Sequence, residues 1–166
     1  MTGLVPRCGA AALGLLLAAG CADSPLSPGE LRELRLAQER WTGSGLRDYA
    51  VEMRSACFCR PEIVEWATVE VRNGQVTRVV MSSGEVVTEG YRLDWWHTVD
   101  QLFDDLLAHP NEPNNVLRDI RLRFDPTYGY PTEIRRDVHE NIADGASIRY
   151  LRNLAPLPAA SPAPGR

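Results

Sequence analysis

Apolar residues recur at helical spacing in two stretches of the chain. Ser27 and Glu30 are placed as a capping box at the start of the first stretch, and Pro28 suits the first helical turn. The apolar stripe that follows consists of Leu31, Leu34 and Trp41. Glycines after residue 42 end the pattern, which therefore predicts a helix over 28–42.

The second helical stretch has apolar residues at the i, i+3, i+4, i+7 and i+8 positions that face a core. These residues are Val99, Leu102, Phe103, Leu106 and Leu107. Thr98 and Gln101 are placed as a second capping box, and Pro110 ends the pattern. The pattern predicts a helix that begins near residue 98.

Elsewhere apolar and polar residues alternate, or form short β-branched runs, as they do in strands. The Asn-Gly pair at 73–74 joins two such runs and is a strong signal for a β-hairpin. Pro61 ends the first run, and the fourth run is weaker than the others. The predicted strands cover 49–59, 64–72, 75–81, 85–91, 116–124, 132–138 and 147–153.

The predicted order is one helix, three or four strands, a second helix and three strands. Strands joined by short turns pair antiparallel, and the helices then cover one face of the sheet. We therefore expect an α+β fold, a two-layer sandwich in which an antiparallel sheet of about six to seven strands carries two helices on one face. Each half is a helix followed by a strand meander, which suggests two αβββ units.

The beginning of the chain has the pattern of an exported lipoprotein. A short segment with Arg7 and no acidic residue precedes an apolar run over 10–19, and small residues lead to Cys21. These are the parts of a secretory signal peptide, and the run is shorter than the roughly 20 residues of a membrane-spanning helix. The cysteine after Ala-Ala-Gly resembles a bacterial lipoprotein signal, which implies that Cys21 is acylated. A plain signal peptide with a chance cysteine is the alternative.

Four parts of the chain are therefore expected. Residues 1–20 form the signal peptide, and residues 21–27 form a short tether. Residues 28–154 form a single α+β domain, long enough to bury a core without a metal or a disulfide. Residues 155–166 are rich in proline and alanine, cannot pack a core and are predicted to be disordered.

Composition and charge narrow the range of partners. The chain has 44% apolar and 24% charged residues, as ordinary globular proteins do. Its 18 basic residues are all arginine and are scattered singly or in short pairs among 22 acidic residues. Because the sequence has no basic stripe, no nucleic-acid partner is expected. The expected partners are the membrane, through the lipid on Cys21, and an unidentified envelope protein.

The sequence has no pattern that indicates catalysis, a cofactor or a metal. It contains neither a Gly-x-Ser-x-Gly elbow nor a glycine-rich phosphate loop. A zinc site needs about four ligands, and a calcium loop needs alternating acidic residues. The residues considered for these sites lack such spacing: His97, His109, His139, Asp125, Asp137 and Asp144. We therefore expect a protein that is not an enzyme, with no catalytic residue, metal or cofactor.

Cys57 and Cys59 are the most specific feature of the predicted domain. In an extended strand two such residues share one face, with Cα atoms roughly 6.5 to 7 Å apart. That separation is at the upper end of the about 4.4 to 6.8 Å found in disulfides, so a disulfide requires a bend, which the nearby Pro61 favours. Three alternatives stay open: a structural disulfide, two unpaired buried thiols, and redox or metal chemistry.

Two stretches rich in aromatic residues are candidates for binding. One is a turn that Asp125 starts, and tyrosines on such a stiff loop favour an interface. The residues of this possible binding tip are Tyr128, Gly129, Tyr130 and Pro131. The alternative is a turn whose rings cover the sheet edge. The Trp-Trp-His sequence at 95–97 is interpreted as packing at a helix entry, with a carbohydrate platform as the alternative.

Several of these motifs are familiar in combination. Cys-Phe-Cys at 57–59, Asn-Gly at 73–74 and Asp-Pro-Thr-Tyr-Gly-Tyr-Pro-Thr at 125–132 resemble a family of small bacterial lipoproteins catalogued as a domain of unknown function. The resemblance covers about 41–154. It implies an exported, lipid-anchored envelope protein and no established activity. Ala22, where some lipoproteins have Asp, is compatible with the outer membrane, on its periplasmic side, if the cell has two membranes.

These observations lead to a ranked set of hypotheses. The first is a lipid-anchored envelope protein whose domain is a non-catalytic protein- or peptide-binding module. The alternative is a thiol redox or redox-sensing protein that uses Cys57 and Cys59. The redox alternative is disfavoured because Cys57 is expected on the apolar face of its strand, with Val51 and Met53. A purely structural envelope role is not separable from the first hypothesis by sequence.

Overall fold

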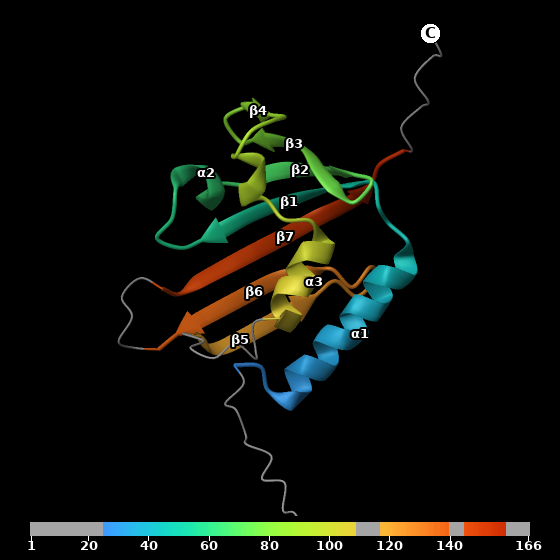
Figure 1. Ribbon diagram of the computed structural model, residues 1–166, viewed down its shortest axis with the longest axis vertical. Helices are drawn as coiled ribbons and strands as arrows, with labels where there is room; N and C mark the ends of the chain where they lie inside the picture. Colours follow the sequence, from blue (N-terminus) through green and yellow to red (C-terminus); the bar gives the residue numbers. More distant parts are fainter. Residues whose placement is uncertain (1–24, 109–116, 140–144, 159–166) are drawn as a thin grey trace, which may run out of the picture.

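The computed structural model describes residues 25–108, 117–139 and 145–158 (Figure 1). The predicted signal peptide, Cys21, His109 and Asp144 lie outside these ranges. The described elements are α1 (Pro28–Ser44), β1 (Tyr49–Ala56), α2 (Pro61–Val64), β2 (Ala67–Arg72), β3 (Gln75–Met81), β4 (Val86–Val87), η1 (Leu93–Trp95), α3 (Val99–Ala108), β5 (Leu117–Phe124), β6 (Pro131–Val138) and β7 (Ser147–Pro156).

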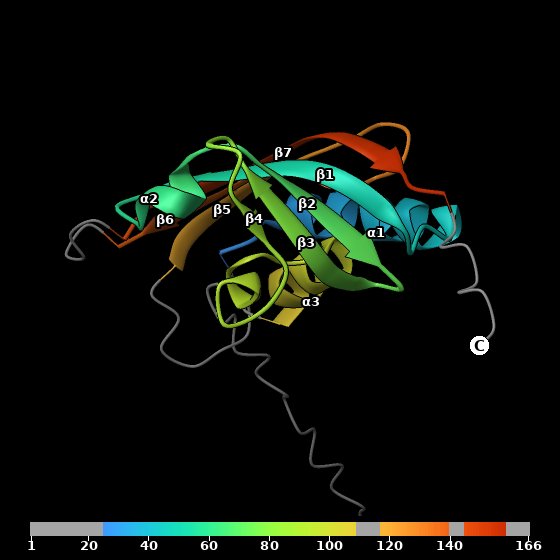
Figure 2. The same cartoon turned by 90° about the horizontal axis from the view of Figure 1, so that it is seen from above.

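The strands form one antiparallel sheet of seven strands in the order β4-β3-β2-β1-β7-β6-β5. Two meanders, β1 to β4 and β5 to β7, meet where β1 pairs with β7. Helices α1 and α3 lie on the same concave face of the arched sheet (Figure 2). The predicted two-layer α+β sandwich is confirmed, and each meander follows one of these helices.

Alternation along the strands places one face of the sheet in the core. In β1, Tyr49, Val51 and Met53 are almost fully buried, whereas the residues between them are only half-buried on the other face. The apolar stripes of the two helices cover the buried face. Their buried residues are Leu34, Ala37 and Trp41 in α1 and Val99, Leu102, Phe103 and Leu106 in α3.

Two buried aromatic residues also join these elements through hydrogen bonds. The backbone N–H of Val99 donates to the Tyr49 hydroxyl at 2.9 Å, and Trp41 Nε1 donates to Asp100 Oδ1 at 3.0 Å. The Trp41 and Tyr49 rings meet edge to face, with centroids 5.2 Å apart. The first turn of α3 is thus tied to both α1 and β1, and the polar atoms of both rings are paired.

Both predicted capping boxes are confirmed. The Ser27 hydroxyl accepts from the backbone N–H of Glu30 at 3.2 Å, and the Glu30 carboxylate accepts from the backbone N–H of Ser27 at 2.9 Å. Thr98 and Gln101 exchange the same pair of bonds at 3.2 and 2.8 Å. Local sequence therefore sets where both helices begin.

Three strands of the first meander differ from the prediction. The first strand ends at Ala56 rather than at residue 59. The strand predicted from residue 64 begins at Ala67, because Pro61 supplies the fixed φ of a first helical turn and starts the short helix α2. The strand predicted over 85–91 is only two residues long, and the chain then turns into η1.

The domain begins earlier than residue 28. Leu26, predicted to lie in the tether over 21–27, is buried in the core. The Pro25 carbonyl accepts a hydrogen bond at 3.0 Å from the backbone N–H of Ile120 in the edge strand β5. These two contacts make the last residues of the predicted tether part of the folded unit.

The sheet also continues past residue 154, into the predicted tail over 155–166. Ala155 and Pro156 belong to β7 and lie opposite Ala50 and Tyr49 of β1. The backbone N–H of the next residue, Leu157, donates to the Asp48 carbonyl at 3.0 Å. The composition of this segment predicted disorder. The backbone of β1 offers it hydrogen-bond partners, however, and pairing with β1 makes these residues part of the strand.

Candidate functional site

The Cys-Phe-Cys sequence forms a disulfide-closed loop just beyond the end of β1. Cys57 and Cys59 are bonded, with Cα atoms 5.2 Å apart, which is closer than in an extended strand. The required bend is available because β1 ends at Ala56. The disulfide alternative is therefore confirmed. Two buried thiols are excluded, since Cys57 is half-buried and Cys59 is exposed. Cys57 thus does not lie on the buried face of the strand.

Phe58, between the two cysteines, is the most exposed large apolar residue of the described part of the chain. It is 88% exposed, compared with 66% for Tyr91, 47% for Val86 and 44% for Leu36. The disulfide constrains the backbone on both sides of the ring. A single exposed apolar side chain is common on protein surfaces, so its significance depends on the residues around it.

The surface next to the loop is aromatic and basic. The Arg60 guanidinium carbon lies 5.0 Å from the centroid of the Trp95 ring, and the Tyr91 ring meets Trp95 edge to face with centroids 5.4 Å apart. Phe58, Arg60, Tyr91 and Trp95 are called the aromatic patch below. The fold thus brings the Cys-Phe-Cys stretch and the Trp-Trp-His stretch together, through the contact of Arg60 with Trp95.

The Trp-Trp-His stretch packs at the entry to α3, as one of its two interpretations predicted. Trp96 is buried. Arg60 covers a face of the Trp95 ring, which disfavours a carbohydrate platform.

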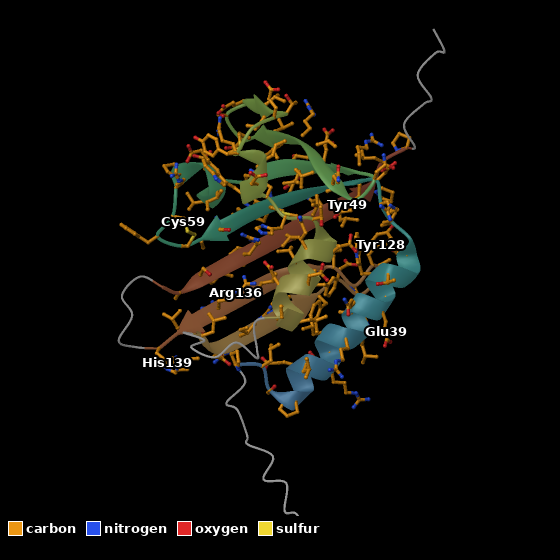
Figure 3. All side chains as sticks on the ribbon, in the orientation of Figure 1. Glu39, Tyr49, Cys59, Tyr128, Arg136 and His139 are labelled. Atoms are coloured by element: carbon orange, nitrogen blue, oxygen red, sulfur yellow. A yellow bond between two sulfur atoms is a disulfide. The ribbon has the colours of Figure 1, made fainter. Side chains whose placement is uncertain are left out.

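The turn at 125–131 lies far from the disulfide loop: Figure 3 places Tyr128 and Cys59 on opposite sides of the molecule. Gly129, Tyr130 and Pro131 are buried, and Tyr128 is half-buried. These residues do not form an exposed binding tip, because α1 packs on the turn. The structure instead matches the alternative, a turn whose rings cover the sheet, since both tyrosine rings pack on the core.

Gly129 shows how closely helix and turn approach each other. Its φ is 83°, a left-handed conformation that favours glycine. A Cβ atom at this position would lie 2.3 Å from the carbonyl oxygen of Ala37 in α1. Only a residue without a side chain fits between the turn and the helix.

Asp125 starts the turn as predicted. Its Oδ1 atom accepts from the backbone N–H groups of Thr127 at 2.9 Å and Tyr128 at 2.6 Å. This carboxylate therefore serves as a hydrogen-bond acceptor for the backbone of the turn. Across residues 25–108, 117–139 and 145–158, no three His, Cys, Asp or Glu side chains are grouped to hold a metal ion.

A basic cluster under the helices was not predicted from the sequence. Arg136 of β6 and Arg149 of β7 lie on the concave face of the sheet, Arg136 beside α3 (Figure 3). The signal was present in the strand alternation, because Arg136 has the same parity as the buried Ile134, and Arg149 the same parity as the buried Leu151. Arg149 Nη1 lies 3.2 Å from His97 Nδ1. A guanidinium has only donors, so His97 accepts through Nδ1 and is neutral.

Burial and neighbouring charges lower the pKa values of this cluster. Burial, followed by the charge of Arg149, lowers the pKa of His97. Burial also lowers the pKa of Arg136, and burial together with the charge of Arg136 lowers the pKa of Arg149 to about 10. Asp105 of α3 acts in the opposite direction on all three groups. At neutral pH both arginines are charged.

Comparison with known proteins gives one match. The model of DUF6174, a family of unknown function, matches residues 33–156. No curated protein and no solved structure matches the chain. The match confirms the predicted resemblance to a family of unknown function, whereas the lipoprotein character stays a prediction. Among the described helices, none has the length and apolar character needed to cross a membrane.

Proposed function

The chain belongs to the DUF6174 family of unknown function, and on that premise we propose that it is an exported, lipid-anchored envelope protein whose domain binds another protein or peptide without catalysis. The signal-like sequence that ends in Cys21 supports export and acylation. Ala22 supports a place on the periplasmic side of the outer membrane, where the cell has two membranes. The family brings no activity, so the binding role is argued from the surface of the domain.

The exposure of Phe58 is the observation that carries the binding proposal. A ring that is 88% exposed leaves apolar area in water that a pocket on a partner can bury. Burying such a side chain contributes about 1.5–3 kcal/mol. Because the disulfide constrains the loop before binding, little conformational entropy is lost when the partner closes around the ring.

The rest of the aromatic patch has the composition of an interface centre. Aromatic residues and arginine are enriched at such centres, and Tyr91, Trp95 and Arg60 supply them here. Tyr91 is 66% exposed, so its ring is available together with Phe58. Next to Tyr91 in the chain, Arg92 pairs with Glu85, and such exposed ion pairs are typical of a polar rim.

Site-specific photo-crosslinking in the producing cells tests the binding role. A photoreactive phenylalanine analogue at position 58 is expected to give a discrete crosslinked product. Leu36 on α1, 44% exposed and lying beside β5, is the matched control position and is expected to give none. The proposal is contradicted if both positions label the same proteins.

A quantitative version uses the identified partner and purified protein. Phe58→Ala is expected to weaken binding about tenfold or more, as the loss of one buried aromatic side chain requires. Leu36→Ala is expected to leave the dissociation constant unchanged. Unaltered binding by Phe58→Ala would assign the interface to another surface.

Intact-mass measurement of the protein from its native membrane tests the anchor. The expected mass is that of a chain starting at Cys21 plus a lipid-sized increment. A Cys21→Ser variant is expected to lack the increment and to leave the membrane fraction. A wild-type chain of unlipidated mass would contradict the proposed location while leaving the binding role open to the crosslinking test.

A second candidate function is thiol redox chemistry, which the exposure of Cys59 favours. One thiolate of a partner dithiol would attack Cys59 and displace the Cys57 thiolate, and the second partner thiolate would then displace Cys59. The partner becomes a disulfide as this loop becomes a dithiol, and the protons of the partner pass to the two cysteines. A reduction potential near that of glutathione, unchanged in Phe58→Ala, would support this function; a disulfide that resists glutathione would exclude it.

A further inference from the structure

The first described residues are attached to the edge strand β5 of the sheet. The Pro25 carbonyl accepts from the backbone N–H of Ile120 in β5 at 3.0 Å, and Leu26 is buried in the core. In Figure 1 this start of the described chain, in blue, lies beside β5 at the lower end of the molecule. A lipid anchor that precedes Pro25 therefore holds the domain at its β5 edge.

The chain between the proposed lipid and this edge is short. Pro25 is the fourth residue after Cys21. Four residues span at most about 14 Å when fully extended. In the acylated protein proposed above, on which this inference rests, the acyl chains hold Cys21 at the lipid surface. Pro25 therefore lies within about 14 Å of that surface.

The sheet is wider than this reach. Strands β5 and β4 are the two edges of the seven-stranded sheet. Six strand spacings of about 4.8 Å separate them by roughly 29 Å along the sheet. Figure 1 shows β4 and α2 at the upper end of the molecule, away from β5. The side that carries β5 and the start of α1 therefore faces the lipid, and the β4 side is held away from it.

Strand β5 has the charge that an anionic lipid surface attracts. Its eight residues include Arg118, Arg121 and Arg123 and a single acid, Asp119, although the whole chain has a net charge of −4. All three arginines are exposed. Among the residues that the structure describes, Arg118 forms no ion pair. Arg121 and Arg123 pair with acids but stay 71% and 79% exposed, so their guanidinium groups remain accessible to a lipid phosphate.

Helix α1 does not carry such an excess of positive charge. Its acidic and basic residues are equal in number: Glu30, Glu33 and Glu39, and Arg32, Arg35 and Arg40. The short tether alone allows either β5 or the start of α1 to face the lipid. The charge favours β5, because arginine binds phosphate in a bidentate manner and each basic side chain near an anionic surface adds to the attraction.

We infer that β5 is the membrane-facing edge of the domain, where Arg118, Arg121 and Arg123 contact the phosphates of anionic lipid headgroups. The aromatic patch is then carried on the side away from the lipid, because its residues follow β1 and β4 in the chain. This orientation deepens the proposed binding role. The partner reaches the patch from the aqueous side and not from within the anchoring membrane.

Energy transfer from the protein to a vesicle surface tests this orientation. The chain that starts at Cys21 is coupled through that thiol to a maleimide lipid, since Cys57 and Cys59 are bonded and no other cysteine follows Cys21. The vesicles contain phosphatidylglycerol in phosphatidylcholine, with an acceptor dye on a lipid headgroup. This coupling does not require acylation by the cell. A missing native anchor, detected by intact mass, is therefore distinguished from a wrong orientation.

A fluorescent amino acid is placed at one exposed position at a time. His139 follows β6 next to the start of β5, since Val138 lies opposite Leu117, and Figure 3 shows His139 at the lower end of the molecule. Tyr91, 66% exposed, follows β4 at the far edge. Transfer from position 139 is expected to exceed transfer from position 91 severalfold. Equal transfer from the two positions, or the reverse order, would overturn the inference.

Replacing the β5 arginines tests the contact with phosphate. Arg118→Gln combined with Arg121→Gln and Arg123→Gln should lower the ratio of the two transfers about twofold or more, toward the ratio in vesicles of phosphatidylcholine alone. Arg118→Gln by itself removes no ion pair, so it keeps the test independent of folding defects. It should lower the ratio by a smaller amount.

Three arginines on the opposite side of the sheet provide the matched control. Arg72, Arg78 and Arg92 each form an ion pair, and they belong to or follow β2, β3 and β4. Replacing all three by glutamine removes the same amount of charge and should leave the ratio of transfers unchanged. An equal decrease in both triple variants, or a ratio that does not depend on phosphatidylglycerol, would overturn the assignment of β5 as the lipid-binding edge.

Discussion

The disulfide loop and the turn at 125–131 are both short, stiff and aromatic. The loop exposes its ring to solvent, whereas the turn packs its rings against the core. Phe58 is 88% exposed, whereas Tyr130 is 5% exposed. The loop is stiffened by a disulfide, and the turn by prolines and the Asp125 side chain. The sequence left the turn open as a possible binding tip or as a turn whose rings cover the sheet edge, and the buried Tyr130 matches the second interpretation.

The difference lies in what packs on each element. Helix α1 lies over the turn so closely that a Cβ on Gly129 would meet the Ala37 carbonyl oxygen. The Cys57–Cys59 loop projects past the end of β1, and Phe58 is left in solvent. A stiff aromatic turn is therefore either a packing element or a binding element, and only its coverage by the rest of the fold distinguishes the two roles.

Gly129→Ala is expected to have the largest effect on stability and to test the covered side of the comparison. Left-handed strain and the contact with α1 together should lower the free energy of unfolding by about 2–4 kcal/mol. Gly84→Ala is the matched control, because Gly84 has a φ of 86° but nothing within 4 Å of an added Cβ. Its loss, measured by urea denaturation, should be about 1–2 kcal/mol. Equal losses would mean that α1 does not press on the turn.

Asp125→Ala tests the side-chain bonds that stiffen the same turn. Two backbone N–H groups lose their acceptor, one of them partly buried, so a loss of about 1–2 kcal/mol is expected in thermal or urea denaturation. Asp125→Asn keeps an acceptor oxygen and should lose less. Equal destabilisation by Asp125→Ala and Asp125→Asn would show that the acceptor oxygen of Asp125 does not stabilise the turn.

Removing both cysteines of the disulfide loop tests how the exposed side is stiffened. Because the closed loop is so short, Cys57→Ser with Cys59→Ser should lower the free energy of unfolding by only about 1.5 kcal/mol in the chain-entropy account. Partner affinity should fall as well, since Phe58 then binds from a flexible loop. Unchanged affinity in the double variant would show that the disulfide does not preorganise the ring.

The pH dependence of stability tests His97, which belongs to neither the disulfide loop nor the turn. Burial and Arg149 lower the pKa of His97, so the unfolded chain binds this proton more readily than the fold does. The contribution of His97 is therefore fully present above pH 6.5 and is lost as the pH falls from 6.5 toward the lowered pKa. His97→Gln should flatten this slope in urea titrations at stepped pH, and the exposed His139→Gln should retain it.

Phe58→Ala is expected to have the smallest effect on stability. A ring in solvent contributes little to the fold, so the free energy of unfolding should change by less than about 0.5 kcal/mol. Combined with an affinity loss of about tenfold, this result would sharpen the contrast with the buried turn. A loss of stability above about 1 kcal/mol would show that the ring packs on the domain after all.

The helix starts and the strand alternation could be predicted because they depend on residues a few positions apart. Ser27 with Glu30, and Thr98 with Gln101, act within one helical turn, and the buried positions of β1 follow from a period of two. The candidate site was predicted only in part. The Cys57–Cys59 motif was identified, but the exposure of Phe58 depends on the absence of a covering element, which no local pattern encodes.

By itself, therefore, the sequence determined the α+β class, the antiparallel meanders, the two long helices and the existence of each motif. The tertiary structure decided which stiff turn is covered, that Arg149 lies beside His97, and that Arg60 meets Trp95 beside the disulfide loop. These features depend on strand register and on helix placement over the sheet. Both are contacts between residues far apart in the chain, and periodicity within a segment carries no information about them.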